Sequence, residues 1–355
     1  MLNTSNITGN EDLSIQSLGA AVVGVILYII GLPANILLIV TFTRLKRLRV
    51  THNLFTVNLA VCDTFLIGIL LPITFTTAAT GSYPLSPDAC LIAAMFSYLC
   101  FTGSVMALMC IAISRYVKVC QSQYYNKVFN RMSLCVFCTG IWLVGLIFAI
   151  PLLILEDGFF MDVTLHMCVF NRYKYMIYSI TYMFFCLMLP ISLTVLCYGM
   201  IYRCYRKSKL RLYRNWNNGL AQTRLKHEDA ISRAHFAVFA SYLLLLMPFG
   251  LVAMFQKADD NPRFMHLLVI YLCYTNSCVN TIVYGVFNSN IRKAYKDSIP
   301  CFGFNRQKSV FFANSFPNRS GTVRSKRRVL PVTGCSDSST PEEHRHTADN
   351  NDTKY

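Results

Sequence analysis

The sequence predicts an all-α membrane protein, a seven-transmembrane helix bundle with a short amphipathic helix after the seventh span. The chain has 355 residues, of which 54% are hydrophobic and 14% charged. Its apolar residues gather in seven stretches, each near the roughly 20 residues that cross a bilayer. Lys and Arg, which give a net charge of +16, fall in short clusters between those stretches. This pattern excludes an ordinary soluble enzyme and a nucleic-acid partner, because the basic residues do not share one surface.

Each stretch is expected to be a helix, because in lipid the backbone satisfies its hydrogen bonds only internally. The third and fifth are long enough to tilt or protrude. Prolines interrupt several spans, and we expect kinks at Pro33, Pro72, Pro151, Pro190 and Pro248. The predicted spans are approximately 18–43, 53–80, 88–120, 132–155, 174–202, 232–256 and 264–287.

Basic residues of short loops orient the bundle, since they stay in the cytoplasm. The loop after the first span holds Arg44, Lys46, Arg47 and Arg49, and the loop from Arg203 to Lys226 is similarly basic. The opposite loops are acidic or mixed. We therefore expect a multi-pass plasma-membrane protein with an extracellular N-terminus, residues 1–17. Glycosylation sequons begin there at Asn3 and Asn6.

The segment after the seventh span has two parts. Residues 288–300 read as a basic amphipathic helix on the inner leaflet, with Cys301 as a palmitoylation candidate. Residues 301–355 are polar, and we expect a disordered cytoplasmic tail. Four of its residues lie near acidic groups and are phosphorylation candidates: Ser336, Ser338, Ser339 and Thr340.

Ionisable residues inside spans are costly and mark function. Asp63 lies near the middle of the second span. A carboxylate among oxygen donors suits a hard cation such as sodium, or a proton. The alternative is a protonated Asp in a structural hydrogen-bond network. The polar groups expected around it are Asn35, Ser104, Asn276, Ser277 and Asn280.

Two further pairs have defined places in this topology. Arg115 ends the third span and Glu228 begins the sixth at the same depth, so they either face each other as a switch or each reach the interface separately. Cys90 and Cys168 both lie on the oxidising side, where a bridge would hold the outer loop over the bundle. Such a bridge stabilises by roughly 4 kcal/mol in the chain-entropy treatment.

Taken in order, these motifs resemble the rhodopsin-like family of G-protein-coupled receptors from Asn35 to about Lys293. The matching segments are LPANILLIV, NLAVCD, SRY at Ser114 to Tyr116, Pro248 and NTIVY at Asn280 to Tyr284, together with Cys90, Trp142, Cys168, Pro190 and Tyr198. Within the family, SRYVKVCQSQYYNKVF and NTIVYGVFNSNIRKAYK are most similar to the melatonin-receptor group and related orphan invertebrate receptors.

The resemblance implies a receptor, and not an enzyme, that binds an extracellular ligand and activates a heterotrimeric G protein when the sixth helix moves outward. It also implies the inhibitory G-protein class, with arrestin and receptor kinase as partners at the tail. Arg115 would pair with Glu228 in the inactive state and then meet Tyr198, with Tyr284 holding the open state. The implied sodium pocket, an allosteric site, is Asp63, Ser104, Asn276, Ser277 and Asn280.

The chain departs from the family at several positions. Ser114 replaces the usual Asp before the Arg, Leu246 replaces the aromatic toggle, and Thr281 replaces the Pro after Asn280. We expect transmission to use other packing, around Tyr242 and Phe249. By the resemblance, Leu152 occupies the fourth-span position at which the melatonin-receptor group is expected to have a ligand-binding Asn.

The resemblance places the ligand cavity between the third, fifth, sixth and seventh spans, with His266 near the rim. Ser97 replaces the Asp of amine receptors and Tyr274 the lysine of opsins, which disfavours both ligand classes. A neutral or apolar small molecule is expected. The predicted lining is Ser97, Tyr98, Phe101, Tyr182, Met183, Cys186, Phe249, Gly250, Tyr271 and Tyr274.

Two alternatives stay open at this point. An intramembrane hydrolase needs a buried metal or nucleophile cluster. The histidines do not provide one, because we expect His52, His166, His227, His235, His344 and His346 at loops, span ends or the tail. A seven-span transporter would show internal repeats and broken helices, and the two halves show no self-similarity.

Overall fold

The computed structural model of the protein describes residues 4–44, 53–80, 82–162, 167–172, 174–214, 219–255, 263–287, 291–293 and 295. They belong to one compact unit, Met1–Asn305. A second unit, Arg306–Tyr355, lies outside the described residues. The predicted tail therefore stays a prediction.

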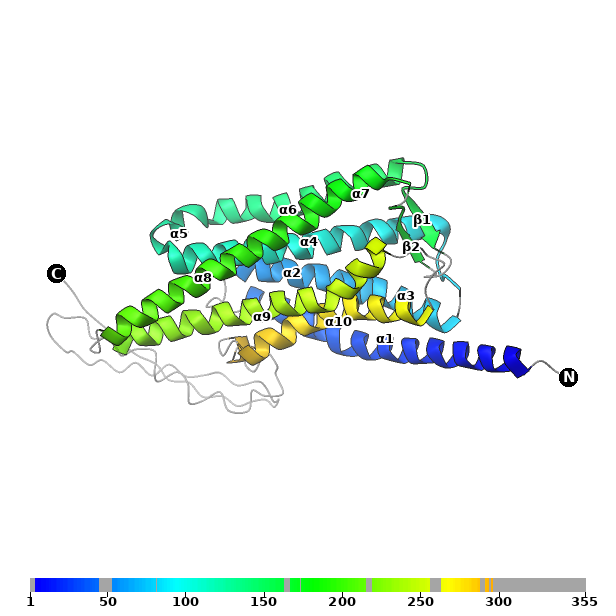
Figure 1. The fold of residues 1–355 in the computed structure, drawn as a ribbon, viewed down its shortest axis with the longest axis horizontal. Helices are drawn as coiled ribbons and strands as arrows, with labels where there is room; N and C mark the ends of the chain where they lie inside the picture. The colour runs from blue at the N-terminus through cyan, green and yellow to red at the C-terminus, as the bar shows by residue number, and fades with distance from the viewer. Residues whose placement is uncertain are drawn as a thin grey trace, which may run out of the picture. The chain divides into compact units, whose positions relative to one another are not determined.

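Seven helical segments of the described chain are long and apolar enough to cross a membrane, which confirms the predicted bundle. Three of them are longer than expected: the helix of the first span begins at residue 4, that of the sixth begins at residue 219, and that of the fifth ends at residue 214. Apolar patterning marks only the part of a helix that lipid surrounds, whereas the helix continues where its own hydrogen bonds allow. The helices are α1 (Thr4–Arg44), α2 (Asn53–Phe65) with α3 (Leu71–Thr80), α4 (Pro87–Cys120), α6 (Arg131–Ile154), α7 (Met176–Tyr182) with α8 (Leu189–Arg214), α9 (Gly219–Phe255) and α10 (Arg263–Phe287) (Figure 1).

The second and fifth spans each contain a π-helical turn, η2 (Leu66–Leu70) and η3 (Met183–Met188). Pro72 and Pro190 lie just beyond these turns. A proline ring clashes with the carbonyl four residues before it, which here belongs to residue 68 or 186, inside the π turn. The wider turn accommodates the proline ring at these two positions.

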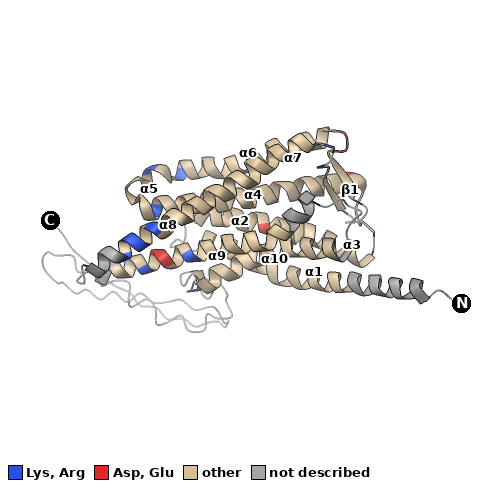
Figure 2. Ribbon diagram, in the orientation of Figure 1, with Lys and Arg blue, Asp and Glu red and all other residues tan. Residues whose placement is uncertain are grey.

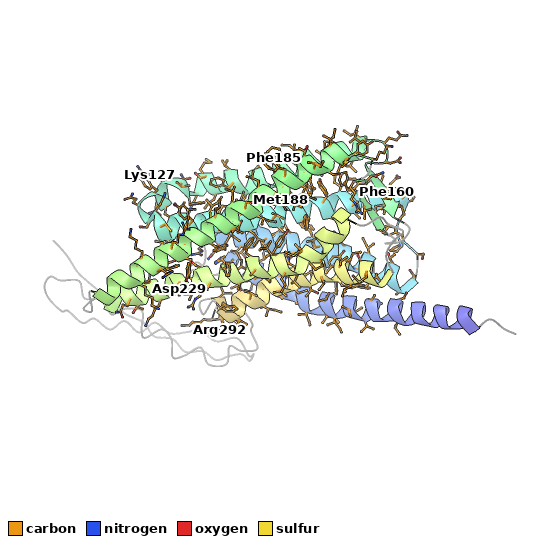
Figure 3. The ribbon with its side chains drawn as sticks, in the orientation of Figure 1. Lys127, Phe160, Phe185, Met188, Asp229 and Arg292 are labelled. Carbon is orange, nitrogen blue, oxygen red and sulfur yellow. A yellow bond between two sulfur atoms is a disulfide. The ribbon has the colours of Figure 1, made fainter. Side chains whose placement is uncertain are left out.

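Helix α4 is the centre of the bundle. It contacts α2, α6, α8 and α9, and most of its residues between 99 and 112 are buried. The outward faces carry exposed apolar side chains instead, for example Ile147 on α6 and Ile177 on α7. Phe185 and Met188 of the fifth span, labelled in Figure 3, are about half exposed. An apolar exterior around a polar-containing core is the arrangement that lipid requires.

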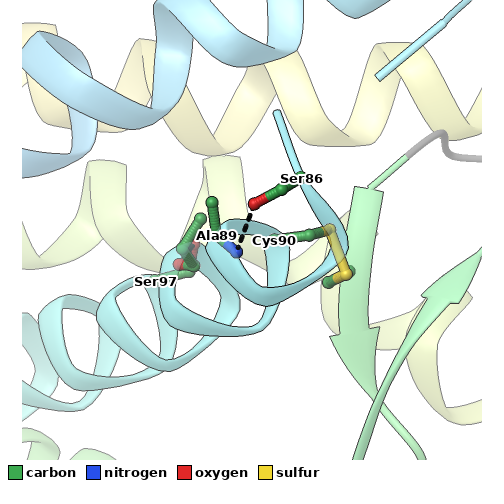
Figure 4. The surroundings of a disulfide bond; sticks show 6 residues. Ser86, Ala89, Cys90 and Ser97 are labelled. Atoms are coloured by element: carbon green, nitrogen blue, oxygen red, sulfur yellow. Dashed lines mark hydrogen bonds between the residues drawn. A yellow bond between two sulfur atoms is a disulfide. The ribbon is translucent and has the colours of Figure 1, made fainter. Parts of the chain in front are cut away.

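One end of the bundle carries a disulfide and is called the disulfide end. There β1 (Phe159–Asp162) and β2 (Met167–Phe170) form an antiparallel pair with Met161 opposite Cys168. Cys168 is bonded to Cys90 at the start of α4, as predicted, and the Ser86 hydroxyl caps that helix by accepting from the Ala89 N–H (Figure 4). The strand pair was not predicted, because two four-residue apolar runs have no distinctive period.

The same loop holds a small ion-pair group on its surface. The Lys174 ammonium lies 3.0 Å from Asp157 Oδ2 and 3.4 Å from Glu156 Oε2. The hydrogen bond to Asp157 raises the pKa of Lys174 above its ordinary value.

The opposite end is called the basic end. It carries Lys118, Lys127, Arg203, Arg206 and Lys207 (Figure 2). A short helix, α5 (Ser122–Val128), follows α4 there and was not predicted. Aromatic rings hold it in place: Tyr125 stacks on Phe129 at 5.4 Å, and Phe129 meets Phe55 of α2 at 6.3 Å and Phe137 of α6 (Arg131–Ile154) at 5.8 Å.

The chain after α10 is described only at Ile291, Arg292, Lys293 and Tyr295, and these residues are helical. Ile291 is buried, whereas Arg292 donates to the Val286 carbonyl at 2.8 Å and so caps α10. Figure 3 places Arg292 at the end of that helix. One buried and one exposed face agree with an amphipathic segment; Cys301 lies outside the described residues.

Candidate functional site: a buried acid and an ion pair at the basic end

A polar cluster occupies the middle of the bundle around Asp63, which is 1% exposed. Asn280 on α10 donates from Nδ2 to Asp63 Oδ2 at 2.8 Å. The predicted companions Ser104, Asn276 and Ser277 are also buried. Helices α2, α4 and α10 therefore bring these polar side chains together in the apolar interior of the bundle.

Four side-chain oxygens of this cluster have no hydrogen-bond partner: Asp63 Oδ1, Ser104 Oγ, Asn276 Oδ1 and Asn280 Oδ1. Buried polar atoms are nearly always paired, so unpaired oxygens need an explanation. A carboxylate with hydroxyl and amide oxygens is the donor set that a hard cation prefers. The residues present therefore fit a sodium ion.

Asn35 joins α1 to α10 beside this cluster. Its Nδ2 donates to the carbonyls of Gly31 and Ser277, each at 3.0 Å, and its Oδ1 accepts from the Thr281 hydroxyl at 3.1 Å. Thr281 replaces the family's proline, and its hydroxyl supplies a bond that a proline lacks. The sequence showed that Thr281 replaces the family's proline, but it did not predict the hydrogen bond to Asn35, because only the fold brings these two residues together.

At the basic end, Arg115 on α4 and Glu228 on α9 lie face to face. Arg115 Nη1 is 3.7 Å from Glu228 Oε2, and the side chains are 2% and 35% exposed. At this distance the two side chains form an ion pair but no hydrogen bond. Of the two arrangements that the sequence left open, the structure contains the facing one. The neighbouring Ser114 hydroxyl is buried without a hydrogen-bond partner, so it does not engage Arg115 as the family's Asp would.

A polar bond and ring contacts also join α9 to α8 at this end. Tyr205 and Ser232 share a hydrogen bond of 3.2 Å, and Tyr198 packs on Phe236 and Phe239. On α9, Asp229 pairs with Arg233 at 3.2 Å along the helix surface, and Figure 3 labels Asp229 near this end. The predicted switch residue Tyr198 thus lies between α8 and α9.

His235 corrects one expectation. It was placed at a span end, yet it is 3% exposed and its ring meets Tyr284 of α10 edge-on at 5.3 Å. Its Nδ1 lies 2.8 Å from the Ile231 carbonyl. The expectation was wrong because α9 begins at residue 219, so position 235 is already inside the bundle.

At the disulfide end, Ser97 and Tyr274 line a small cavity together with Thr74, Tyr83 and both bonded cysteines. Its volume of about 20 Å³ holds one water. Tyr274 shares a hydrogen bond of 2.9 Å with Thr74, and burial raises the pKa of Tyr83 above its ordinary value. This cavity lies between the second, third and seventh spans.

The predicted lining residues of the third and fifth spans pack against each other instead. Tyr98 and Tyr182 stack at 4.3 Å, Tyr182 bonds to Thr102 at 3.0 Å, and Cys186 is fully buried. Phe101 lies beside Tyr242 at 6.5 Å, and Met183 is half-buried. The hydroxyls of Tyr98, Tyr242 and Tyr271 have no hydrogen-bond partner. They are the free polar groups of this region of the described chain.

Some predicted residues lie outside what the structure describes. Only the helical backbone is described at Asn6, Phe249, Gly250 and His266, and Asn3 and Cys301 are not described at all. Within the described residues, no group of three or more His, Cys, Asp or Glu could hold a metal ion. A contact that the sequence did not predict joins α6 to α2, where Trp142 Nε1 donates to Asn58 Oδ1 at 2.9 Å.

Seven spans, a buried acid and an Arg at the basic end define a seven-transmembrane receptor of the rhodopsin type. The chain belongs to the rhodopsin family of seven-transmembrane receptors, whose pattern it matches over residues 34–284. It is a multi-pass plasma-membrane signalling receptor and not an enzyme. The family implies an extracellular ligand and a heterotrimeric G protein as partners.

Melatonin receptors are among its relatives. The chain is 27% identical over 310 residues to melatonin receptor type 1A of Gallus gallus, which covers 85% of each chain. It is also 27% identical over 299 residues to type 1C of Xenopus laevis, covering 81% of this chain and 69% of that receptor. The fold is similar to that of squid rhodopsin, with a TM-score of 0.72 and 18% identity over 81% of this chain and 86% of that one.

Proposed function

We propose that this receptor has an extracellular N-terminus, binds a neutral or weakly polar small molecule from outside, and activates a heterotrimeric G protein when α9 moves outward. The observation that carries the proposal is the ion pair between Arg115 and Glu228 at the basic end. It joins α4, the central helix of the bundle, to α9. Such a contact is suited to exist in one state and separate in another.

The energetics of this pair favour a switch over a permanent support. Glu228 is 35% exposed, so solvent screens the pair and its contribution is about 1 kcal/mol at most. Arg115 is 2% exposed, and its charge is costly to leave without a carboxylate. Losing Glu228 therefore favours any state in which Arg115 reaches water or a partner. That state is α9 displaced from α4.

The proposed ligand chemistry follows from the disulfide-end side chains. Unpaired hydroxyls at Tyr98 and Tyr271 offer hydrogen bonds, and aromatic rings offer apolar contact. The residues lining the described cavity include no Asp or Glu to bind an amine. The relatives are named melatonin receptors, which makes melatonin the first probe. However, Leu152 packs on Ala94 and Phe159 and offers no hydrogen bond there.

The resemblance also supports an inhibitory G protein as the first class to test. Arrestin and receptor kinase would act at residues 301–355, and the basic end would meet anionic lipid. Charge alone does not select a G-protein class, so a reporter for each class is required.

The test is a panel of cells that report several G-protein classes, with wild type and Glu228→Ala at equal surface expression. We expect Glu228→Ala to raise ligand-independent signalling by about fivefold, equivalent to about 1 kcal/mol. Asp229→Ala, next to it but paired along α9 with Arg233, is the matched control and should leave signalling unchanged. Equal signalling from Glu228→Ala and Asp229→Ala would contradict the switch. No response of any class would contradict the G-protein assignment.

We further propose that sodium binds at Asp63 and stabilises the inactive state. The support is the set of four unpaired buried oxygens around it. Replacing potassium by sodium should raise the receptor's melting midpoint and lower ligand-independent signalling, because an ion that binds one state stabilises it. Asp63→Asn should abolish both effects. Asp88→Asn, the same change at an exposed position of α4, should retain them. Sodium sensitivity that persists in Asp63→Asn would exclude this site.

A further inference from the structure

Two cysteines face each other across α4 and α8 at the basic end. The Cys120 thiol lies 3.9 Å from the Met200 carbonyl oxygen, and the Cys204 thiol lies 3.8 Å from the Val119 carbonyl oxygen. Met200 is one turn before Cys204, and Val119 directly precedes Cys120. Each thiol therefore reaches the backbone beside the other one.

Both thiols open into one cavity of about 300 Å³, lined also by Tyr116, Met200, Arg203 and Lys207. Each cysteine is half-buried, so a small reagent in that cavity reaches both. Figure 2 shows basic residues along this part of α8. A nearby cation stabilises a thiolate, which is the reactive form of cysteine. Arg203 and Lys207 line the same cavity as the two thiols.

Most other cysteines of the described chain are placed differently. Cys62, Cys100 and Cys110 are buried in the core, where a polar oxidant has no access. Cys135 is exposed on α6, away from the cavity. The combination of a facing thiol, shared solvent access and adjacent cations is found at Cys120 and Cys204.

We propose that Cys120 and Cys204 form a reversible disulfide when the receptor meets hydrogen peroxide or an organic hydroperoxide. The thiolate of Cys204 attacks the peroxide O–O bond, which gives a sulfenic acid and releases hydroxide, or an alkoxide from a hydroperoxide. The Cys120 thiol then attacks that sulfur, the S–S bond forms and water leaves. The pair of sulfurs loses two electrons and the peroxide gains them. Disulfides on the cytosolic side are transient and redox-sensing, which suits a reversible bond.

The bond would tie α8 to α4 at the end where the receptor contacts its partner. Tyr198, which packs on α9, lies six residues before Cys204 on the same helix. A covalent tie restrains any shift of α8 that accompanies release of α9. We therefore expect the oxidised receptor to signal less, a consequence that rests on the proposed function.

The bond itself is tested on the full-length receptor in membranes. Mild hydrogen peroxide, alkylation of free thiols, proteolysis and mass spectrometry should give one peptide pair that joins Cys120 to Cys204 and is released by reductant. Cys120→Ser and Cys204→Ser should each lack it, whereas Cys135→Ser should retain it. The proposal is overturned if either cysteine stays reduced, oxidises without cross-linking or joins a different cysteine. Mapping in the wild type needs no variant, so a poorly folding variant leaves the test intact.

The consequence is tested by ligand-independent G-protein signalling before and after peroxide. Wild type should lose about fivefold or more, the lower range of ordinary allosteric coupling, while Cys204→Ser loses none. A cross-link without any change in signalling overturns the regulatory role. Absence of signalling under all conditions, with the cross-link present, contradicts the proposed function and leaves the modification site standing.

Discussion

The bond from Thr281 to Asn35 gives the sharpest prediction about how this receptor replaces a family proline. Thr281→Val preserves shape but removes the hydroxyl that lies 3.1 Å from Asn35 Oδ1. Asn35 is fully buried, and both its amide N–H groups are already directed at carbonyls. In the Thr281→Val variant, Asn35 Oδ1 therefore loses its hydrogen-bond donor. An orphaned buried acceptor costs about 1–3 kcal/mol, which lowers the melting midpoint by about 2–12 °C on the scale of 150–250-residue domains.

The measurement is the fraction of full-length receptor in detergent that stays unaggregated on heating, read by size-exclusion chromatography. Thr194→Val is the matched control: Thr194 is 1% exposed, and its hydroxyl bonds only to the Pro190 carbonyl of its own helix, at 2.8 Å. That carbonyl keeps its helical N–H partner, so we expect a loss of about 1 kcal/mol or less. The reasoning is refuted if both variants lose equally, or if Thr281→Val costs as much in an Asn35→Ala background as in wild type.

Two further predictions concern the helix contacts. Trp142→Phe removes the 2.9 Å bond to Asn58 and should destabilise the receptor by about 1 kcal/mol or more, measured by the same heating assay. Cys168→Ser breaks the bridge to Cys90, which closes a loop of 78 residues, and should cost up to about 4 kcal/mol and reduce surface expression. Unchanged expression of Cys168→Ser would show that the hairpin stays in place without the bridge.

The site was only partly predictable from the sequence. Asp63, Asn280 and Arg115 stand out because ionisable and amide groups are rare in apolar spans. Their companions are different: Thr281, Thr74 and Asn58 are ordinary polar residues of membrane helices, and nothing local indicates which neighbours they bond. His235 shows the same limit, since an error of 13 residues in where a helix begins moved it from an interface to the interior.

The sequence by itself determined the number of spans and their order, because hydrophobicity acts locally along the chain. The tertiary structure alone decided which helix faces meet. It brought Arg115 to Glu228, the Cys120 thiol to the backbone of α8 beside Cys204, and Thr281 to Asn35. Such pairings join residues far apart in sequence, and they depend on the rotation of each helix about its axis. That rotation is set by the packing of all its neighbours together, which no single segment encodes.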